Sequence, residues 1–199
     1  MDLYFLLELI GTIAFAVSGA GIAIRKKMDI LGIIFLGLLT AVGGGILRDL
    51  ILGVTPPVAF QTPVYSFIAI VVSVLTFLFR SKSKLLLDYN LVLLAMDSIG
   101  LAEFTVAGVK AGMYSGNIFL EIVVGFLTGV GGGMLRDIFA GEIPAIFDKG
   151  FYASASIIGA AATVFLWPLG GNFAMFCGTI LILLLRFAAI KFQWDLPKA

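Results

Sequence analysis

A stretch of 11 residues occurs twice in this chain, and it restricts the possible folds more than any other feature. Residues 40–50 read TAVGGGILRDL, and residues 128–138, 88 positions further on, read TGVGGGMLRDI. Each copy lies inside a long apolar segment, where each glycine weakens a helix by about 1 kcal/mol relative to alanine. A charged residue near the centre of a bilayer costs at least about 2.5 kcal/mol. Both costs recur at matching positions, which indicates that the chain uses them.

The composition predicts an integral membrane protein. Of the 199 residues, 61% are hydrophobic and 13% are charged, and the mean hydropathy is +1.13. Because a spanning helix needs about 20 mostly apolar residues, the apolar runs predict seven transmembrane helices. They lie at about residues 3–24, 29–53, 63–80, 89–109, 117–139, 150–167 and 172–190. The runs lack the in–out alternation of barrel strands, so we expect an all-α polytopic membrane protein.

The first six segments form two matching units of three. The fifth segment repeats the second at an offset of 88 residues, and Glu8 in the first segment falls on Asp97 in the fourth. Three crossings make the second unit enter the membrane from the opposite face, so the units are inverted repeats. We expect them at residues 1–86 and 87–168, followed by a seventh helix and tail at 169–199. A cleaved signal peptide would not recur inside the chain, so we keep the first segment.

Basic residues gather in the loops on one side of the predicted helices. The basic residues on this side are Arg25, Lys26, Lys27, Arg80, Lys82, Lys84, Lys149, Lys191 and Lys198. The opposite side has Lys110 alone near a loop. The positive-inside rule then predicts that the N-terminus is outside and the C-terminus is cytoplasmic.

The glycine triplets predict irregular points in the second and fifth helices. They consist of Gly43, Gly44, Gly45, Gly131, Gly132 and Gly133. Glycine near a helix midpoint permits a kink or a short unwound stretch. Unwinding frees carbonyls that favour a cation and N–H groups that favour an anion. The alternative is that the triplets serve only close packing between helices.

The Arg-Asp pairs, Arg48-Asp49 and Arg136-Asp137, place four charges in apolar segments. Consecutive residues on a helix point about 100° apart, so we expect each arginine to pair with a carboxylate elsewhere. The candidates are Glu8, Asp97, Glu103 and the acid of the other repeat. Intramembrane acids are functional candidates by default, whereas a salt bridge that only holds the two units together is the alternative.

The residue inventory argues against an enzyme. The chain has no histidine and a single cysteine, Cys177, which excludes His–Cys metal sites and histidine-dependent triads. We expect no bound cofactor and no nucleic-acid partner. The only metal that we expect is a monovalent cation near Asp49, Asp97 and Asp137.

The duplicated Gly-Gly-Gly-x-x-Arg-Asp motif, in the second and fifth of seven helices, resembles a known family. It is similar to the prokaryotic branch of the trimeric intracellular cation (TRIC) channels, also catalogued as putative glycine transporters or as an uncharacterised inner-membrane family. The resemblance implies a homotrimer in the inner membrane of a prokaryote, in contact with lipid. It also implies one pore per subunit, between the inverted repeats and kinked at both triplets, for potassium and also sodium.

Two functions remain open on the residues alone. A cation channel would line its path with carboxylates such as Asp49, Asp97 or Asp137, with a constriction near Ser18 or Thr105. A secondary transporter for glycine or another small zwitterion would need an arginine and an acid together, which Arg48 or Arg136 and a neighbouring carboxylate would supply. The resemblance favours the channel.

Overall fold

The computed structural model describes residues 3–83, 89–148 and 151–194, and the regular structure of these residues is helical. The elements in chain order are α1 (Leu3–Arg25), α2 (Ile30–Ile51), α3 (Val58–Gln61), α4 (Val64–Ser83), α5 (Tyr89–Gly112), η1 (Met113–Ser115), α6 (Ile118–Phe139), α7 (Ala145–Asp148), α8 (Tyr152–Leu166), η2 (Trp167–Leu169) and α9 (Gly171–Phe192). The long helices begin and end within three residues of the predicted segments. The all-α prediction is therefore confirmed.

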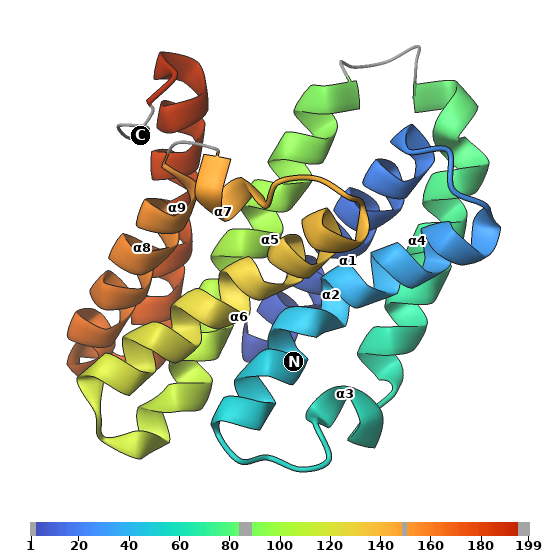
Figure 1. Cartoon of the computed structure of the whole chain (residues 1–199). Helices are drawn as coiled ribbons and strands as arrows, with labels where there is room; N and C mark the ends of the chain where they lie inside the picture. Colours follow the sequence, from blue (N-terminus) through green and yellow to red (C-terminus); the bar gives the residue numbers. More distant parts are fainter. Residues whose placement is uncertain (1–2, 84–88, 149–150, 195–199) are drawn as a thin grey trace.

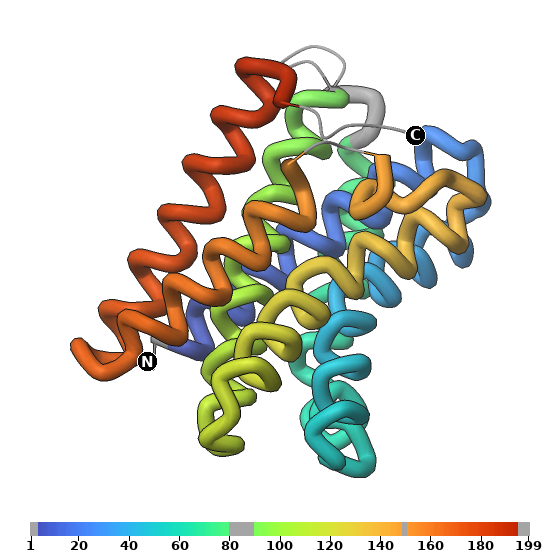
Figure 2. The backbone as a smooth tube through the Cα atoms, turned by 60° about the vertical axis from the view of Figure 1, so that its left-hand side comes forward, coloured from blue at the N-terminus to red at the C-terminus, as the bar shows by residue number. Residues whose placement is uncertain are grey.

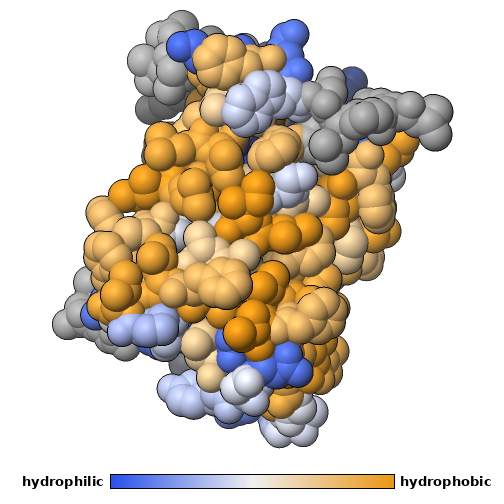
Figure 3. Space-filling model, turned by 90° about the vertical axis from the view of Figure 1, so that its left-hand side faces the viewer, coloured by the Kyte–Doolittle hydropathy of each residue, from blue (hydrophilic) through white to orange (hydrophobic). Residues whose placement is uncertain are grey.

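Within the described residues, six helices are long and apolar enough to cross a membrane. The exception among the predicted spans is α4, whose apolar stretch is limited to Val64–Phe79. Figure 3 shows a broad hydrophobic band on one face of the molecule, with hydrophilic residues at both ends. Six spans follow from length and composition, and the seventh remains a prediction.

The two glycine-containing helices begin and end with the same local chemistry. The side chain of Asp29 accepts a hydrogen bond from the Gly32 amide at the start of α2, and Asn117 caps α6 through the Leu120 amide. Both helices end before a glycine with positive φ, +73° at Gly53 and +67° at Gly141. A left-handed residue there lets the last carbonyls find partners and turns the chain out of the helix. Because the helices end at these positions, Arg48 and Arg136 lie in the last turns of α2 and α6.

The long helices pack as two similar units that run in opposite directions (Figure 1). In each unit three helices contact one another, α1, α2 and α4 in the first and α5, α6 and α8 in the second. The units meet through α1 against α5 and α2 against α6. In Figure 1, α1 and α4 run upward whereas α5 and α8 run downward. The arrangement fits an inverted repeat, although the expected boundary at residues 86–87 lies outside the described residues.

The last helix, α9, has no counterpart in the first unit. It lies against α8 and α5, and the tube in Figure 2 shows it beside α8 at the edge of the molecule. We call the end of the bundle that holds Arg25, Lys26 and Lys27 the basic end. Lys191 lies in the last turn of α9, whereas Lys84, Lys149 and Lys198 lie outside the described residues.

Candidate functional site

The first Arg-Asp pair forms a buried cluster with an acid of α1. Arg48 donates from Nε to Oδ1 of Asp49 over 2.8 Å and from a terminal nitrogen to Oε1 of Glu8 over 3.3 Å. The hydroxyl of Tyr65 on α4 donates to the other oxygen of Glu8 over 2.7 Å. Arg48 and Asp49 are buried, and the side chain of Glu8 is 12% exposed. One arginine therefore holds two carboxylates inside the first unit.

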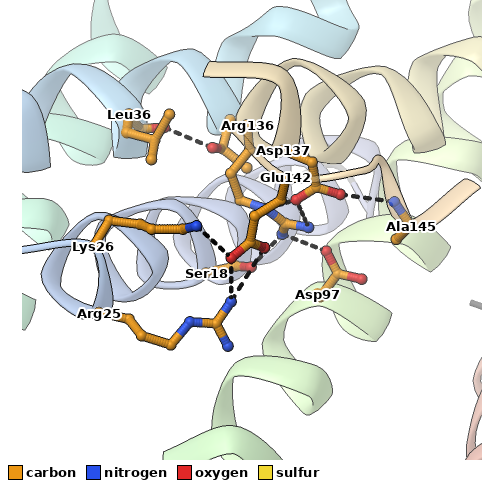
Figure 4. A network of polar contacts seen from close by, with 10 residues as sticks. Ser18, Arg25, Lys26, Leu36, Asp97, Arg136, Asp137, Glu142 and Ala145 are labelled. Carbon is orange, nitrogen blue, oxygen red and sulfur yellow. Dashed lines mark hydrogen bonds and ion pairs between the residues drawn. The ribbon is translucent and has the colours of Figure 1, made fainter. Parts of the chain in front are cut away.

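The second pair repeats this cluster with one added partner (Figure 4). Arg136 donates to Oδ1 of Asp137 over 2.9 Å and to Oδ1 of Asp97 over 2.5 Å. It also donates to the hydroxyl of Ser18 over 2.6 Å. Ser18 belongs to α1, so this cluster joins the two units directly. The buried ion pairs offset the desolvation of the charges only because each group keeps several partners.

The aspartate of each pair also fixes the short helix that follows. Oδ2 of Asp49 accepts from the Val58 amide over 2.8 Å, and Oδ2 of Asp137 accepts from the Ala145 amide over 2.9 Å. These amides belong to the first residues of α3 and α7. Each aspartate therefore binds its arginine with one oxygen and a helix start with the other.

This geometry corrects the expectation that adjacent Arg and Asp side chains do not meet. Both arginines bind the aspartate that follows them. The Cα–Cβ bonds do point apart, but the long arginine stem curls back to a carboxylate that α3 or α7 already holds in place. Of the candidate second partners, Glu8 binds Arg48 and Asp97 binds Arg136, whereas neither arginine pairs with the aspartate of the other repeat among the described residues. Glu103 joins neither cluster.

Each cluster borders a cavity, and the two cavities lie at opposite ends of α1. The first cavity, of about 40 Å³, is lined by Glu8, Arg48, Asp49 and Tyr65, together with Phe104. The second, of about 170 Å³, is lined mainly by Ser18, Arg25, Asp97, Arg136 and Arg186. From Glu8 to Arg25 the helix rises about 25 Å at 1.5 Å per residue. The cavities therefore approach the bundle centre from opposite ends.

The glycine triplets lie where α2 packs against α6. A Cβ atom on Gly44 would collide with the Thr128 carbonyl oxygen, and one on Gly132 would collide with the Thr40 carbonyl oxygen. Phe15, which is fully buried, packs beside Gly132 and contacts Phe104 at 5.3 Å between ring centroids. The middle glycine of each triplet thus permits backbone contact between the units.

Both helices remain α-helical through their triplets, with no unwound stretch. The expected release of carbonyls and N–H groups at these points is therefore wrong, because glycine here removes a steric obstacle and leaves the helical hydrogen bonding in place. A kink at each triplet remains a prediction. Gly43 and Gly131 face leucines of the opposite unit, Leu135 and Leu47. Gly45 lines the first cavity, and Gly133 lies beside Arg136.

The other predicted residues have separate locations. Ser18 lines the second cavity. Thr105 is fully buried and shares a hydrogen bond of 2.7 Å with Ser156, so it belongs to the packing of α5 against α8. Glu103 is 5% exposed, lies against Gly11 of α1, and has one oxygen without a hydrogen bond among the described residues.

Three site residues escaped the sequence reasoning. Tyr65 and Tyr152 occupy the first turns of α4 and α8, and Tyr152 packs beside Gly133. Their spacing of 87 residues was a signal that went unused. Arg186 lies within the apolar run of α9 and stacks over the Tyr152 ring at 4.6 Å. A charge in an apolar run was the signal for Arg186.

Comparison with known proteins places these features in a family. The sequence model of the family described as "Glycine transporter" matches residues 5–81 and 94–168. A "UPF0126 membrane protein" of Vibrio cholerae is 37% identical over 98% of this chain and 82% of its own length. The "UPF0126 inner membrane protein YadS" of Escherichia coli K12 is 37% identical over 98% and 95%.

Two solved structures of TRIC channels are similar to nearly the whole chain. A TRIC channel orthologue from Rhodobacter sphaeroides is 36% identical, with a TM-score of 0.90 over 97% of this chain and 100% of its own. A structure that explains conductance through TRIC cation channels is 36% identical, with a TM-score of 0.89 over 100% and 98%. The chain therefore belongs to the family described as glycine transporters, which is the prokaryotic TRIC family.

Proposed function

We propose that this protein is a channel for monovalent cations, chiefly potassium and also sodium, with one path in each subunit of a homotrimer. The observation that carries the proposal is the pair of cavities at opposite ends of α1, each bordered by an intramembrane carboxylate cluster. The path runs between the inverted units, along α1, α2, α5 and α6. The cation-channel function of the similar solved structures supports it.

The charges favour cations most clearly at the first cavity. Two carboxylates, Glu8 and Asp49, and one arginine, Arg48, line it, for a net charge of −1. A negative lining in a low-dielectric wall raises the local concentration of cations. The arginine keeps the carboxylates from binding a cation too tightly to release, which conduction requires.

In this channel, the contact between α2 and α6 would close the path in the described conformation. Gly44 and Gly132 bring the two backbones together, and Phe15 and Phe104 fill the space beside them. Ions would pass after α2 and α6 separate at this crossing or after the two rings move aside. The aromatic pair thus takes the gating role that the sequence assigned to Ser18 or Thr105.

The packing argues against glycine transport through the Arg-Asp pairs. A zwitterion needs an arginine free to bind its carboxylate, yet Arg48 and Arg136 already hold two carboxylates each. Releasing either arginine would leave buried carboxylates unpaired, at about 3–5 kcal/mol. The channel therefore accounts better for the clusters.

The decisive experiment records purified protein in planar bilayers under a potassium chloride gradient, with bilayers lacking protein as the control. We expect discrete, equally spaced current steps that reverse near the potassium potential and persist in sodium. Reversal near the chloride potential would contradict cation selectivity. Silent bilayers together with saturable glycine uptake into liposomes would establish a transporter. Mass measurement in detergent tests the trimer, and labelling of single cysteines from either side tests the orientation with a cytoplasmic C-terminus.

A further inference from the structure

Glu103 of α5 is a buried acid that neither ionic cluster uses. The residue is 5% exposed, and its Oε2 has no hydrogen-bond partner among the described residues. It lines neither of the cavities that the clusters border. An ionised carboxylate left unpaired in an apolar interior is so costly that the group takes up a proton or moves to water instead. The surroundings of Glu103 decide between these two outcomes.

The backbone of α1 packs directly against Glu103. A Cβ atom on Gly11 would lie 3.1 Å from the Cβ atom of Glu103 and 3.2 Å from the ring of Phe104. A small residue such as glycine permits this close approach of two helices. Phe104 in turn contacts Phe15 of α1, with 5.3 Å between the ring centroids. Glu103 is therefore held within the contact between the two units.

No other charge compensates a charge on Glu103 among the described residues. Buried and partly buried titratable groups occur on α5 and on the helices packed against it: Tyr4, Glu8, Arg48, Asp49, Asp97, Lys110, Glu121, Arg136, Asp137, Tyr152, Cys177 and Arg186. Glu8 and Asp97, within two turns of the contact, belong to the ionic clusters. Lys110 lies over the ring of Tyr4. An ionised Glu103 would therefore stand alone in this packing.

We propose that Glu103 is a proton-binding site, and that loss of its proton separates α1 from α5 at Gly11. A metal ion would need several oxygen ligands, and no group of three or more acidic, histidine or cysteine side chains is suitably placed among the described residues. A proton needs only the carboxyl group itself. The described conformation, with Glu103 packed against Gly11, is accordingly the protonated one.

The consequence for ion flux rests on the proposed channel function. Phe104 lines the first cavity and, with Phe15, fills the space beside the contact between α2 and α6. An ionised Glu103 requires water, so α1 and α5 would part where these two rings meet. Raising the pH favours the conformation that has released the proton. Cation flux should therefore rise as the pH rises.

The first test detects the proton and does not depend on ion flux. Infrared spectra of wild type, Glu103→Gln and Glu142→Gln in lipid vesicles are recorded from pH 5 to pH 9, and the carbonyl band of protonated carboxyl groups is measured. Glu103→Gln keeps the shape of the protonated side chain but cannot release a proton. Glu142, which is partly exposed and paired with Arg25 and Lys26, provides the matched control.

We expect wild type and Glu142→Gln to show a band at pH 6, where exposed carboxyl groups are ionised, and to lose it toward pH 9. Glu103→Gln should lack this band. A wild-type spectrum equal to that of Glu103→Gln at every pH would overturn the proton site. A band that persists unchanged at pH 9 would overturn the switch. If Glu103→Gln does not fold, Glu103→Met, which is apolar and of similar length, replaces it.

Thermal unfolding and planar bilayers test the separation of α1 from α5 with the same variants. Above the pH at which the band is lost, the unfolding equilibrium constant of wild type should rise relative to that of Glu103→Gln. The rise is up to about tenfold per pH unit, as for one linked proton. The open probability of wild type and Glu142→Gln should rise over the same range, whereas Glu103→Gln should stay at its acid level.

The outcomes separate this inference from the channel function on which it rests. An equal pH response of wild type and Glu103→Gln, in unfolding and in open probability, would overturn the proton switch even if all variants conduct cations. Silent bilayers for all three would contradict the channel. The infrared band and the unfolding difference would then still support or overturn the proton site at Glu103.

Discussion

The two ionic clusters are built alike but are placed in different surroundings. In each cluster an arginine binds a carboxylate on either side, and the aspartate also accepts a hydrogen bond from the first residue of a short helix. A tyrosine lies nearby, in the first turn of α4 or α8. In the first, the tyrosine hydroxyl binds Glu8; in the second, it has no partner among the described residues, and Ser18 of the other unit binds the arginine instead. The duplicated motif therefore determines the ion pairs of each cluster. The charged residues around the clusters differ, because they belong to the loops and to α9, which has no counterpart in the first unit.

The largest expected loss of stability concerns the contact between α2 and α6, where the backbones of the two units meet. Gly44→Ala and Gly132→Ala each put a methyl group against a backbone carbonyl, which cannot move aside as a side chain would. We expect a loss of about 3 kcal/mol or more, at the upper end of overpacking. The control is Gly45→Ala, whose nearest contact would be a terminal nitrogen of Arg48 at 3.9 Å. Thermal unfolding in detergent should give wild-type stability or better for Gly45→Ala. Equal losses of stability in all three variants would contradict the backbone contact at Gly44 and Gly132.

Removing the arginines should have the next largest effect. Arg136→Gln leaves two buried carboxylates, Asp97 and Asp137, without their arginine, so we expect a loss of about 3–5 kcal/mol. Arg48→Gln should cost less, because the side chain of Glu8 is 12% exposed and keeps the Tyr65 hydroxyl. Chemical denaturation of both variants, with Arg25→Gln as an exposed control, measures the difference. A larger loss of stability for Arg48→Gln than for Arg136→Gln would show that the contacts of Arg136 with Ser18 and Asp97 stabilise the protein less than their short distances indicate.

The two tyrosines predict a smaller and opposite pair of effects. Tyr65→Phe removes a hydrogen bond to Glu8, for a loss of about 1 kcal/mol. Tyr152→Phe removes a buried hydroxyl that has no partner among the described residues, so stability should be unchanged or slightly higher. Each variant is the control for the other in the same unfolding assay. Destabilisation by Tyr152→Phe would reveal a partner of that hydroxyl, such as a buried water.

The smallest effect concerns a surface contact that only the second unit has. Glu142, after α6, binds Arg25 and Lys26 at 3.0 and 3.1 Å (Figure 4), whereas the equivalent position in the first unit is Val54. Although partial burial acts in the opposite direction, the hydrogen bond from Lys26 and the charges of Arg25 and Lys26 lower the pKa of Glu142. The contact is therefore present at neutral pH and is lost as the pH falls through this lowered pKa.

Glu142→Gln should reduce stability by about 0.2–1 kcal/mol at low salt, as for exposed ion pairs. The loss should shrink as salt screens the charges. Val54→Leu, in the corresponding loop, is the control that changes no charge. Unfolding temperatures from pH 7 to well below pH 4, and at two salt concentrations, measure this effect. A difference that grows with salt would exclude an ion pair.

The sequence predicted the helices well because their signals are local. Apolar runs predicted the seven segments within three residues. Glu8 and Asp97 were among the candidate partners of the arginines, but Glu103 and the acid of the other repeat were named beside them. The contact within each Arg-Asp pair was missed, because it depends on α3 and α7, which hold the aspartate from eight or nine residues away. The unwound stretches were predicted wrongly. The low helix propensity of glycine does not reveal that the backbone of another helix lies against these glycines.

The double role of Asp49 and Asp137 has a consequence for local unfolding. The helices α3 and α7 have four residues each, far too few to be stable alone, since nucleating a helix fixes several residues for one hydrogen bond. The carboxylate that starts each of them also neutralises an arginine inside the bundle. Fraying of either short helix would therefore weaken a buried ion pair, and loss of that ion pair would release the helix. Each short helix and its cluster thus form one cooperative unit, whose amides should exchange with solvent together.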